Sequence, residues 1–436
     1  MSKNIYKNFI SLFSALIPIR KYRKKFRNLA NNAIDYYFCK KFFKKAVGRM
    51  QDKLKNNAKI NVVFLVIFDS VFPAKPLFEK MLEDDSFAPK LLIVPDISRG
   101  DKNQFYQLQK SYNFFVNLYG KDFVMNSYES ESKTFLDPVE DFDIACFANP
   151  YDAMTMELYS IEYYVKNKVL PIYISYGTMP DYYAREHIIN LKSLNLCWKV
   201  FVDTKENFDD VVCYTDQKGQ NAVLSGYCKM DELAEIKHKI LERKKIIIAP
   251  HHTVSMPSFA LSNFLEYSNF FLELPLKYPQ IDFVFRPHPL LFVTLSAPNL
   301  WGKEKVTEYI NKISSYPNVE YQNGGDYFDT FLNSSAIIHD CSSFLMEYLY
   351  TGHPACYMLK NKKEIKEIFA PIGQQCLKNY YHAFNKEDII RFIENVVIAN
   401  NDPMKKERVE FAKEKIMLNY PNVADYIIKN IKEELK

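Results

Sequence analysis

Short apolar segments alternate with amphipathic ones along most of the chain after residue 60. The apolar segments are rich in β-branched and aromatic residues and are apolar nearly throughout, which is typical of parallel strands covered on both faces. One series of strands is predicted at 61–68, 90–95, 143–148, 171–176, 199–204 and 222–227, and a second at 245–250, 281–287, 319–322, 336–340 and 354–358. Alternation of such strands with helices predicts an α/β fold.

The length of the chain predicts two domains, because 436 residues exceed the size at which one core usually keeps growing. The charged segment 231–244, which we expect to be helical, separates the two strand series. We therefore predict one Rossmann-like domain over 59–232, a second over 233–402 and C-terminal helices over 403–436. Two such domains would face a central cleft, with ligands beyond the carboxyl ends of the strands.

The N-terminal segment differs from the rest in charge. Residues 1–60 hold 16 Lys and Arg against two acids, a net charge of +14, whereas the remaining residues carry −9. The apolar segment 9–19 is too short to cross a bilayer, which needs about 20 residues, and a dense basic run follows where a signal peptide would have a cleavage site. We predict a basic amphipathic helical extension over 1–58.

This composition favours an anionic membrane surface as the partner of residues 1–60, because basic residues are interleaved with aromatic ones. The alternative is a pair of solvated basic helices packed on the body. Nucleic acid is not an expected partner, since no recognition motif accompanies the charge. The resulting location would be cytoplasmic, at the inner face of the cell membrane.

Glycine and cysteine usage excludes several classes of protein. Glycine is scarce at 11, and neither G-x-G-x-x-G nor the P-loop pattern occurs, which argues against dinucleotide oxidoreductases and P-loop NTPases. The eight cysteines form no C-x-x-C pair, and several lie in apolar segments. Reduced and mostly buried thiols in a cytoplasmic protein are therefore expected, with no metal and no cofactor.

Polar residues follow the predicted strands at the edge where ligands are expected. Arg286 offers a planar fork to phosphate oxygens, and His288 between two prolines can exchange a proton with a substrate. Ser342 and Ser343 lie where a helix should begin, and free backbone N–H groups there favour phosphate. Each has a structural alternative, namely an ion pair, a core histidine or an N-cap. His251 and His252 follow another strand and would suit a metal, but no acidic or cysteine cluster is near them in sequence.

These motifs resemble the CDP-glycerol glycerophosphotransferase family, which makes teichoic acids and capsule polymers. The resemblance covers about 171–358 and is strongest at 286–289 (RPHP), 326–329 (DYFD) and 340–348 (DCSSFLMEY). The segments 225–233 (SGYCKMDEL) and 249–252 (APHH) are similar to further motifs of this family. The resemblance implies a GT-B-like fold and no obligatory metal.

The resemblance also implies roles for individual residues. A nucleotide-activated donor, CDP-glycerol or a similar CDP-polyol, would be bound by the second domain. The donor-binding residues would be Arg286, Asp340, Ser342, Ser343, Glu347, Gly226 and Lys229, and the acceptor side would include Tyr176, Gly177 and Thr178.

The sequence departs from the family where a catalytic histidine is expected, because Tyr176 occupies that position. A tyrosine of ordinary pKa, about 10, is a poor base at neutral pH. We therefore take His288, His251 and His252 as the candidate catalytic residues, the latter two as a relocated base. The predicted reaction transfers a polyol phosphate, glycerol phosphate first, to a hydroxyl of a glycan or lipid-linked glycan and releases CMP. The alternatives are a glycosyltransferase using a nucleotide sugar and a non-catalytic membrane-associated binding module.

Overall fold

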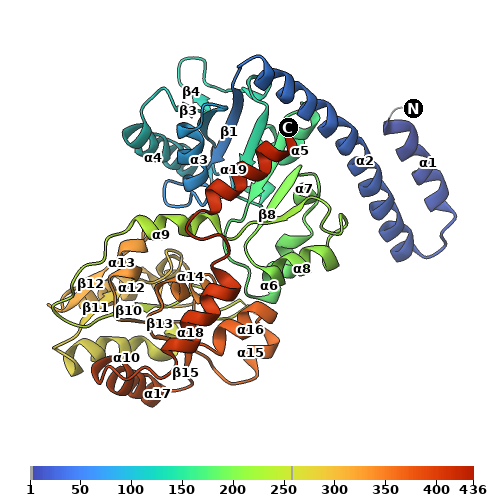
Figure 1. The fold of residues 1–436 in the computed structure, drawn as a ribbon. Coiled ribbons are helices and arrows are strands. Elements are labelled where there is room, and N and C mark those ends of the chain that lie inside the picture. The colour runs from blue at the N-terminus through green and yellow to red at the C-terminus, as the bar shows by residue number, and fades with distance from the viewer. Residues whose placement is uncertain (1–2, 257–258) are drawn as a thin grey trace. The chain divides into compact units, whose positions relative to one another are not determined.

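A computed structural model describes residues 3–256 and 259–436 and divides the chain into two compact units (Figure 1). The first unit comprises the residues up to Tyr176, then 186–229 and 422–436, and the second comprises 177–185 and 230–421. Each unit is built on a parallel sheet, so the predicted α/β fold with two Rossmann-like bodies is confirmed. The unit boundary falls at Met230, whereas the sequence placed it before Leu233, and the segment 177–185 belongs to the second unit.

The first unit contains a seven-stranded sheet in the order β3-β2-β1-β6-β7-β8-β9. Its strands are β1 (Ile60–Val66), β2 (Phe87–Ile93), β3 (Val124–Asn126), β6 (Ile144–Phe147), β7 (Leu170–Ile174), β8 (Lys199–Val202) and β9 (Ala222–Leu224). Its helices are α3 (Lys75–Glu83), α4 (Asp101–Tyr119), α5 (Ile161–Lys166), α7 (Lys192–Asn195), α8 (Lys205–Tyr214) and the last helix α19 (Val423–Glu434). A small antiparallel pair, β4 (Tyr128–Glu129) and β5 (Thr134–Phe135), is separate from the sheet.

The basic N-terminal segment forms two helices of the first unit, α1 (Lys3–Ala15) and the long α2 (Arg20–Lys55). The two helices contact each other through the Lys7–Asp35 ion pair at 2.7 Å and the rings of Tyr6 and Phe38. α2 is tied to the rest of its unit by Lys53, whose Nζ lies 2.7 Å from Asp143. Among the described residues, no helix combines the length and the apolar character that crossing a bilayer requires.

The second unit contains a six-stranded sheet in the order β12-β11-β10-β13-β14-β15. Its strands are β10 (Lys245–Ala249), β11 (Asp282–Phe285), β12 (Val319–Tyr321), β13 (Ala336–His339), β14 (Ala355–Met358) and β15 (Tyr381–Ala383). Its helices are α6 (Tyr182–Ala184), α9 (Asp231–Glu235), α10 (Phe264–Lys277), α11 (Leu291–Leu295), α12 (Gly302–Ser314), α13 (Phe328–Leu332), α14 (Phe344–Glu347), α15 (Glu364–Glu367), α16 (Pro371–Leu377), α17 (Lys386–Arg391) and α18 (Lys405–Phe411).

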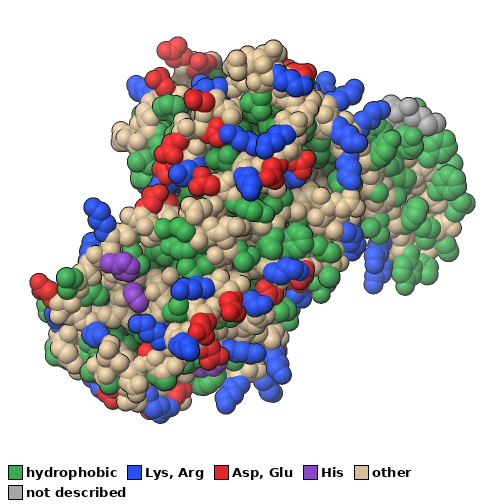
Figure 2. Space-filling view, in the orientation of Figure 1, with side chains coloured by type: hydrophobic (Ala, Val, Ile, Leu, Met, Phe, Trp, Pro, Cys, Tyr) green, Lys and Arg blue, Asp and Glu red, His purple; other side chains and the backbone are tan. Residues whose placement is uncertain are grey.

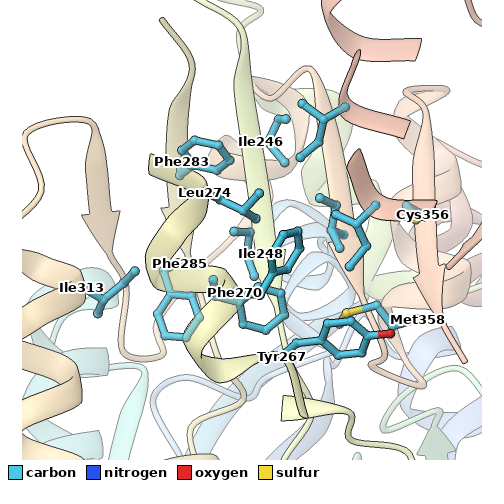
Figure 3. Close-up of a cluster of buried hydrophobic side chains, with 14 of the residues drawn as sticks. Ile246, Ile248, Tyr267, Phe270, Leu274, Phe283, Phe285, Ile313, Cys356 and Met358 are labelled. Carbon is cyan, nitrogen blue, oxygen red and sulfur yellow. The ribbon is translucent and has the colours of Figure 1, made fainter. Parts of the chain in front are cut away.

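The core of the second unit shows why its strands are apolar throughout. Ile246 and Ile248 on β10 face α10, where Phe270 and Leu274 pack against them (Figure 3). Ile247, between them on the strand, is also fully buried and faces the other side of the sheet. Both faces of β10 are therefore covered, and burial of each large side chain contributes about 1.5–3 kcal/mol.

All of the predicted strands exist, but three features were missed or wrong. The edge strands β3 and β15 and the β4–β5 pair were not predicted, because each has only two or three residues and no apolar run. The helix predicted over 231–244 ends at Glu235. Beyond it the chain is held by contacts that a helix would break, such as the Lys239 backbone N–H donating to Asn333 Oδ1 at 2.7 Å.

Candidate functional site

The candidate site of the second unit lies at the carboxyl ends of three neighbouring parallel strands, β11, β10 and β13. β10 pairs with both of the others, so the segments that follow the three strands meet at one edge. Two backbone hydrogen bonds align the first two segments, since Arg286 N–H donates to Ile248 O and His288 N–H donates to Pro250 O, both at 2.9 Å. The strand order changes direction at β10, where ligands of such sheets bind.

Three histidines, which we call the imidazole cluster, gather at this edge: His251, His252 and His288. The rings of His252 and His288 stack with centroids 4.1 Å apart, and His251 lies 4.4 Å from His252 and 5.2 Å from His288. One nitrogen from each ring lies within 4.8 Å of the others. The sequence predicted all three histidines at this edge, and the structure brings their rings together.

Burial keeps the imidazole cluster uncharged near neutral pH. It lowers the pKa of His252 to about 4 and the pKa of His288 to about 3, and it lowers the pKa of His251 well below its usual value. The second cause at both His251 and His288 is the nearby ring of His252, because neighbouring imidazoles disfavour a shared positive charge. All three rings are therefore neutral hydrogen-bonding groups near pH 7.

Arg286 is buried, and three contacts hold its guanidinium. Nη1 donates to Gln322 Oε1 at 2.7 Å, and Nη2 donates to the carbonyl of Gly325. The group also lies over the ring of Tyr327, 5.2 Å from its centroid, and the Tyr327 hydroxyl donates to Glu347. These contacts use two of the five guanidinium N–H groups, so they orient the fork and leave donors for a ligand.

Asp340 accepts hydrogen bonds from the backbone at the imidazole cluster and so holds it in place. Its Oδ1 accepts the His251 backbone N–H at 2.6 Å, and its Oδ2 accepts the backbone N–H of Asn263 at 2.6 Å and the Asn263 amide at 3.2 Å. Burial raises the pKa of this carboxyl to about 6. The structure thus gives Asp340 a positioning role for His251, and Asn263 is a partner that no sequence motif pointed to.

Ser342 and Ser343 precede α14 and are tied to the segment 177–185 of the same unit. The Ser342 hydroxyl donates to Asp181, and the Thr178 hydroxyl donates to the carbonyl of Ser343 at 3.2 Å. Asp181 was not singled out in the sequence. Gly177 opens this segment, so two of the three predicted acceptor-side residues, Gly177 and Thr178, belong to the second unit.

The remaining predicted residues lie in the first unit. Tyr176 is 39% exposed, its backbone N–H donates to the Tyr173 hydroxyl, and desolvation raises its pKa further above 10. Together with Asn149 and Met154 it lines a pocket of that unit. Gly226 and Lys229 follow β9, and Gly226 has a positive φ of 93° that favours glycine. Their assignment to the activated donor stays a prediction.

Comparison with known proteins supports the fold and leaves the family open. No protein-family model and no curated protein sequence matches the chain. Among solved structures, UDP-GlcNAc 2-epimerase from Neisseria meningitidis bound to UDP-GlcNAc is 14% identical, with a TM-score of 0.56 over 86% of this chain and 100% of that one. S. aureus MnaA with UDP is 14% identical, with a TM-score of 0.55 over 86% of this chain and 96% of that one.

The wall teichoic acid polymerase TagF, soaked with CDPG, is similar to a comparable degree: 13% identity and a TM-score of 0.54 over 87% of this chain and 90% of that one. At these identities the likeness shows the fold, which is GT-B-like. The matched structures include an epimerase bound to UDP-GlcNAc and a polymerase soaked with CDPG, so two different reactions are represented among them.

Proposed function

We propose that this protein is a transferase that moves a polyol phosphate, glycerol phosphate first, from a CDP-activated donor to a hydroxyl of a glycan acceptor. The main support for the proposal is that Arg286, His288 and the 340–343 segment lie together at the ends of adjacent strands. These residues come from the motifs that resemble the CDP-glycerol glycerophosphotransferases. The fold likeness to TagF with CDPG supports the same class of donor.

In the proposed reaction, the acceptor oxygen forms a bond to the β-phosphorus as the bond from that phosphorus to the CMP oxygen breaks. The hydroxyl proton passes to a base, and CMP leaves with the bonding electrons. Arg286 contributes charge to the phosphate oxygens. The donor and the acceptor together supply every atom of the two products, so no further reactant is needed.

His252 is the best candidate for the base. Its Nδ1 is buried and has no hydrogen-bond partner among the described residues, whereas Nδ1 of His251 and of His288 are both hydrogen-bonded. A base needs a free lone pair, and His252 alone in the cluster has an unengaged Nδ1. With its pKa lowered to about 4, the ring is unprotonated at neutral pH.

A second candidate is an enzyme that uses a nucleotide sugar, because the epimerase with bound UDP-GlcNAc and MnaA with UDP have a similar fold. The same strand-end residues would then bind the diphosphate of a UDP-sugar. The motifs at 286–289 and 340–348 favour the CDP-polyol, since they resemble the glycerophosphotransferase family.

We also propose that α1 and α2 bind an anionic membrane surface at which a lipid-linked acceptor is found. Apolar side chains gather over α1 (Figure 2), and five are exposed along one face of α1 and at the residue that follows it: Ile5, Phe9, Leu12, Phe13 and Leu16. Leu12 and Leu16 are 76% and 77% exposed, so the described residues of the first unit leave these side chains largely uncovered. The net charge of residues 1–60 matches such a surface.

Isothermal titration of the full chain with CDP-glycerol and with UDP-GlcNAc tests the choice of donor. We expect CDP-glycerol to bind and UDP-GlcNAc to bind much more weakly, and we expect CMP release when a lipid-linked glycan is added. Tight binding of UDP-GlcNAc, with no CMP release from CDP-glycerol across several acceptors, would support the second candidate instead.

A further inference from the structure

Backbone and hydroxyl groups fix which nitrogen of two cluster histidines carries the proton. The Leu290 backbone N–H donates to Nδ1 of His288 at 3.1 Å. A nitrogen that accepts an N–H must have its lone pair free, so the proton of the neutral His288 ring is on Nε2. His288 therefore presents an N–H on the side of the ring away from Leu290.

His251 is held in the same tautomer by Thr253. Nδ1 of His251 lies 2.8 Å from Thr253 Oγ1, and the Thr253 backbone N–H points at the same nitrogen at 3.4 Å. Thr253 Oγ1 already accepts the Leu261 backbone N–H at 3.1 Å, so its own proton is free to be donated to Nδ1. The neutral His251 ring then carries its proton on Nε2 as well.

These tautomers distinguish between the two ligands that a histidine cluster usually binds. A divalent metal such as Zn²⁺ needs a lone pair on every ligating nitrogen, and its Zn–N distance is about 2.0–2.1 Å. With the protons of His251 and His288 on Nε2, the only lone pairs of these rings are engaged with Thr253 and Leu290. The rings of His251 and His288 are neighbours, with centroids 5.2 Å apart. N–H groups on two neighbouring rings suit an oxyanion, and both rings can donate without carrying charge.

We infer that His251 and His288 form a receptor for one phosphate group, in which each neutral imidazole donates its Nε2–H to a phosphate oxygen. Thr253 is a positioning residue that sets the tautomer of His251. The inference rests on the proposed function, which supplies the ligand as the diphosphate of the activated donor. His252 is then the ring able to accept a proton, because its Nδ1 has no hydrogen-bond partner within the part of the chain that the structure describes.

The tautomers are tested directly by NMR of the full chain with ¹⁵N-labelled histidine. We expect His251 and His288 to show an unprotonated Nδ1 and a protonated Nε2. Thr253→Val should let His251 populate both tautomers, whereas Thr253→Ser, which keeps the hydroxyl, should preserve the wild-type signal. Protonated Nδ1 at either histidine in the wild type would overturn the inference.

Binding of the phosphate is tested with inorganic phosphate, CMP and CDP-glycerol as probes in isothermal titration. His251→Phe and His288→Phe keep a ring but remove the N–H, and we expect each to weaken CDP-glycerol binding about ten- to a hundredfold. His288→Gln, which retains an N–H donor, should recover most of the affinity. His382→Phe is the matched control, because that ring donates elsewhere in the unit, to the Leu377 carbonyl.

Two outcomes separate this inference from the proposed function. If the phenylalanine variants bind CDP-glycerol as the wild type does while the wild type releases CMP, the receptor is wrong and the function stands. If the variants lose phosphate and CMP binding but no acceptor yields CMP release, the phosphate-binding role of the two histidines is supported and the proposed reaction is not. Stoichiometric uptake of Zn²⁺ or Co²⁺ that is lost in His251→Phe would overturn the receptor in favour of a metal site.

Discussion

The hydroxyl of Ser342 donates a hydrogen bond to the carboxylate of Asp181, a residue 161 positions away in the sequence. Asp181 also accepts the Ala184 backbone N–H at 2.9 Å and so caps α6. Both residues belong to the second unit, and burial raises the pKa of the Asp181 carboxyl. The Ser342 hydroxyl, which the sequence assigned to the donor phosphate, therefore has a structural partner in this state.

Replacing Ser342 by alanine should lower the free energy of unfolding by about 1–3 kcal/mol, because a buried carboxylate loses a hydrogen-bond donor. Urea denaturation followed by circular dichroism measures the change. Ser343→Ala is the control, since the bond from Thr178 reaches the Ser343 carbonyl and not its hydroxyl. A variant of Ser342 with unchanged stability and a raised donor KM would instead show that the hydroxyl serves the ligand.

Arg286→Lys should raise the KM for the activated donor about ten- to a hundredfold with a smaller effect on kcat. Lysine keeps the positive charge, but it loses the planar fork that Gln322 and Gly325 hold in place. Steady-state release of CMP at several donor concentrations gives both constants. Arg243→Lys, at a surface ion pair with Asp282, should leave them unchanged, and equal effects of the two variants would argue against the fork.

The sequence predicted the strands and their polar ends well because both depend on local patterns. A strand buried on both faces is apolar throughout, as at Ile246–Ile248, and the residues that follow it are then placed at the ligand edge by the fold. The same local approach failed at 231–244, where charge suggested a helix and a partner distant in sequence, Asn333, determined the conformation.

Partners that are far apart in sequence escaped prediction for the same reason. Asp340 resembles a family motif, yet its contacts with the His251 backbone and with Asn263 depend on how three strands are ordered in the sheet. The tautomer of His251 likewise depends on a hydroxyl two positions away and on what that hydroxyl already accepts. Such roles depend on hydrogen-bond geometry, which cannot be predicted from residue identity alone.

Asp340→Asn should destabilise the second unit and lower the rate of CMP release. The amide that replaces one carboxylate oxygen must face a backbone N–H, of His251 or of Asn263, and two donors then oppose each other at a cost of about 1–3 kcal/mol. Thermal unfolding and the rate of CMP release are the measurements. Asp282→Asn should cost less than about 1 kcal/mol, because it breaks only an exposed ion pair. Equal losses in the two variants would contradict the positioning role.

His252→Ala should lower kcat about 10²–10⁴-fold with little change in donor affinity, because it removes the proposed base and neither of the two proposed phosphate donors. Single-turnover release of CMP isolates the chemical step. His353→Ala provides a control for loss of a buried imidazole in the same unit. Unchanged kcat in His252→Ala, with donor binding intact, would rule out the relocated base.

The second unit should lose stability as the pH falls from about 6.5 toward 4. Burial lowers the pKa of His252 to about 4 and the pKa values of His288 and His339 to about 3, against about 6.5 in the unfolded chain. The unfolded state then binds more protons, so stability is complete above pH 6.5 and declines below it. Asp340, whose pKa is raised to about 6, and Asp181, whose pKa is also raised, act in the opposite direction. The histidines outnumber them, because burial also lowers the pKa of His353 to about 4 and the pKa of His251 well below its usual value.

Melting temperatures measured at intervals between pH 7.5 and pH 4, roughly spanning these pKa values, test this directly. The double variant His252→Gln/His288→Gln removes two of these histidines and should give a shallower decline than the wild type. Saturating CDP-glycerol should also reduce the decline, because a phosphate beside the imidazole cluster favours the protonated rings and raises their pKa values. Parallel curves for the wild type and the double variant would show that the cluster does not govern the acid sensitivity of this unit.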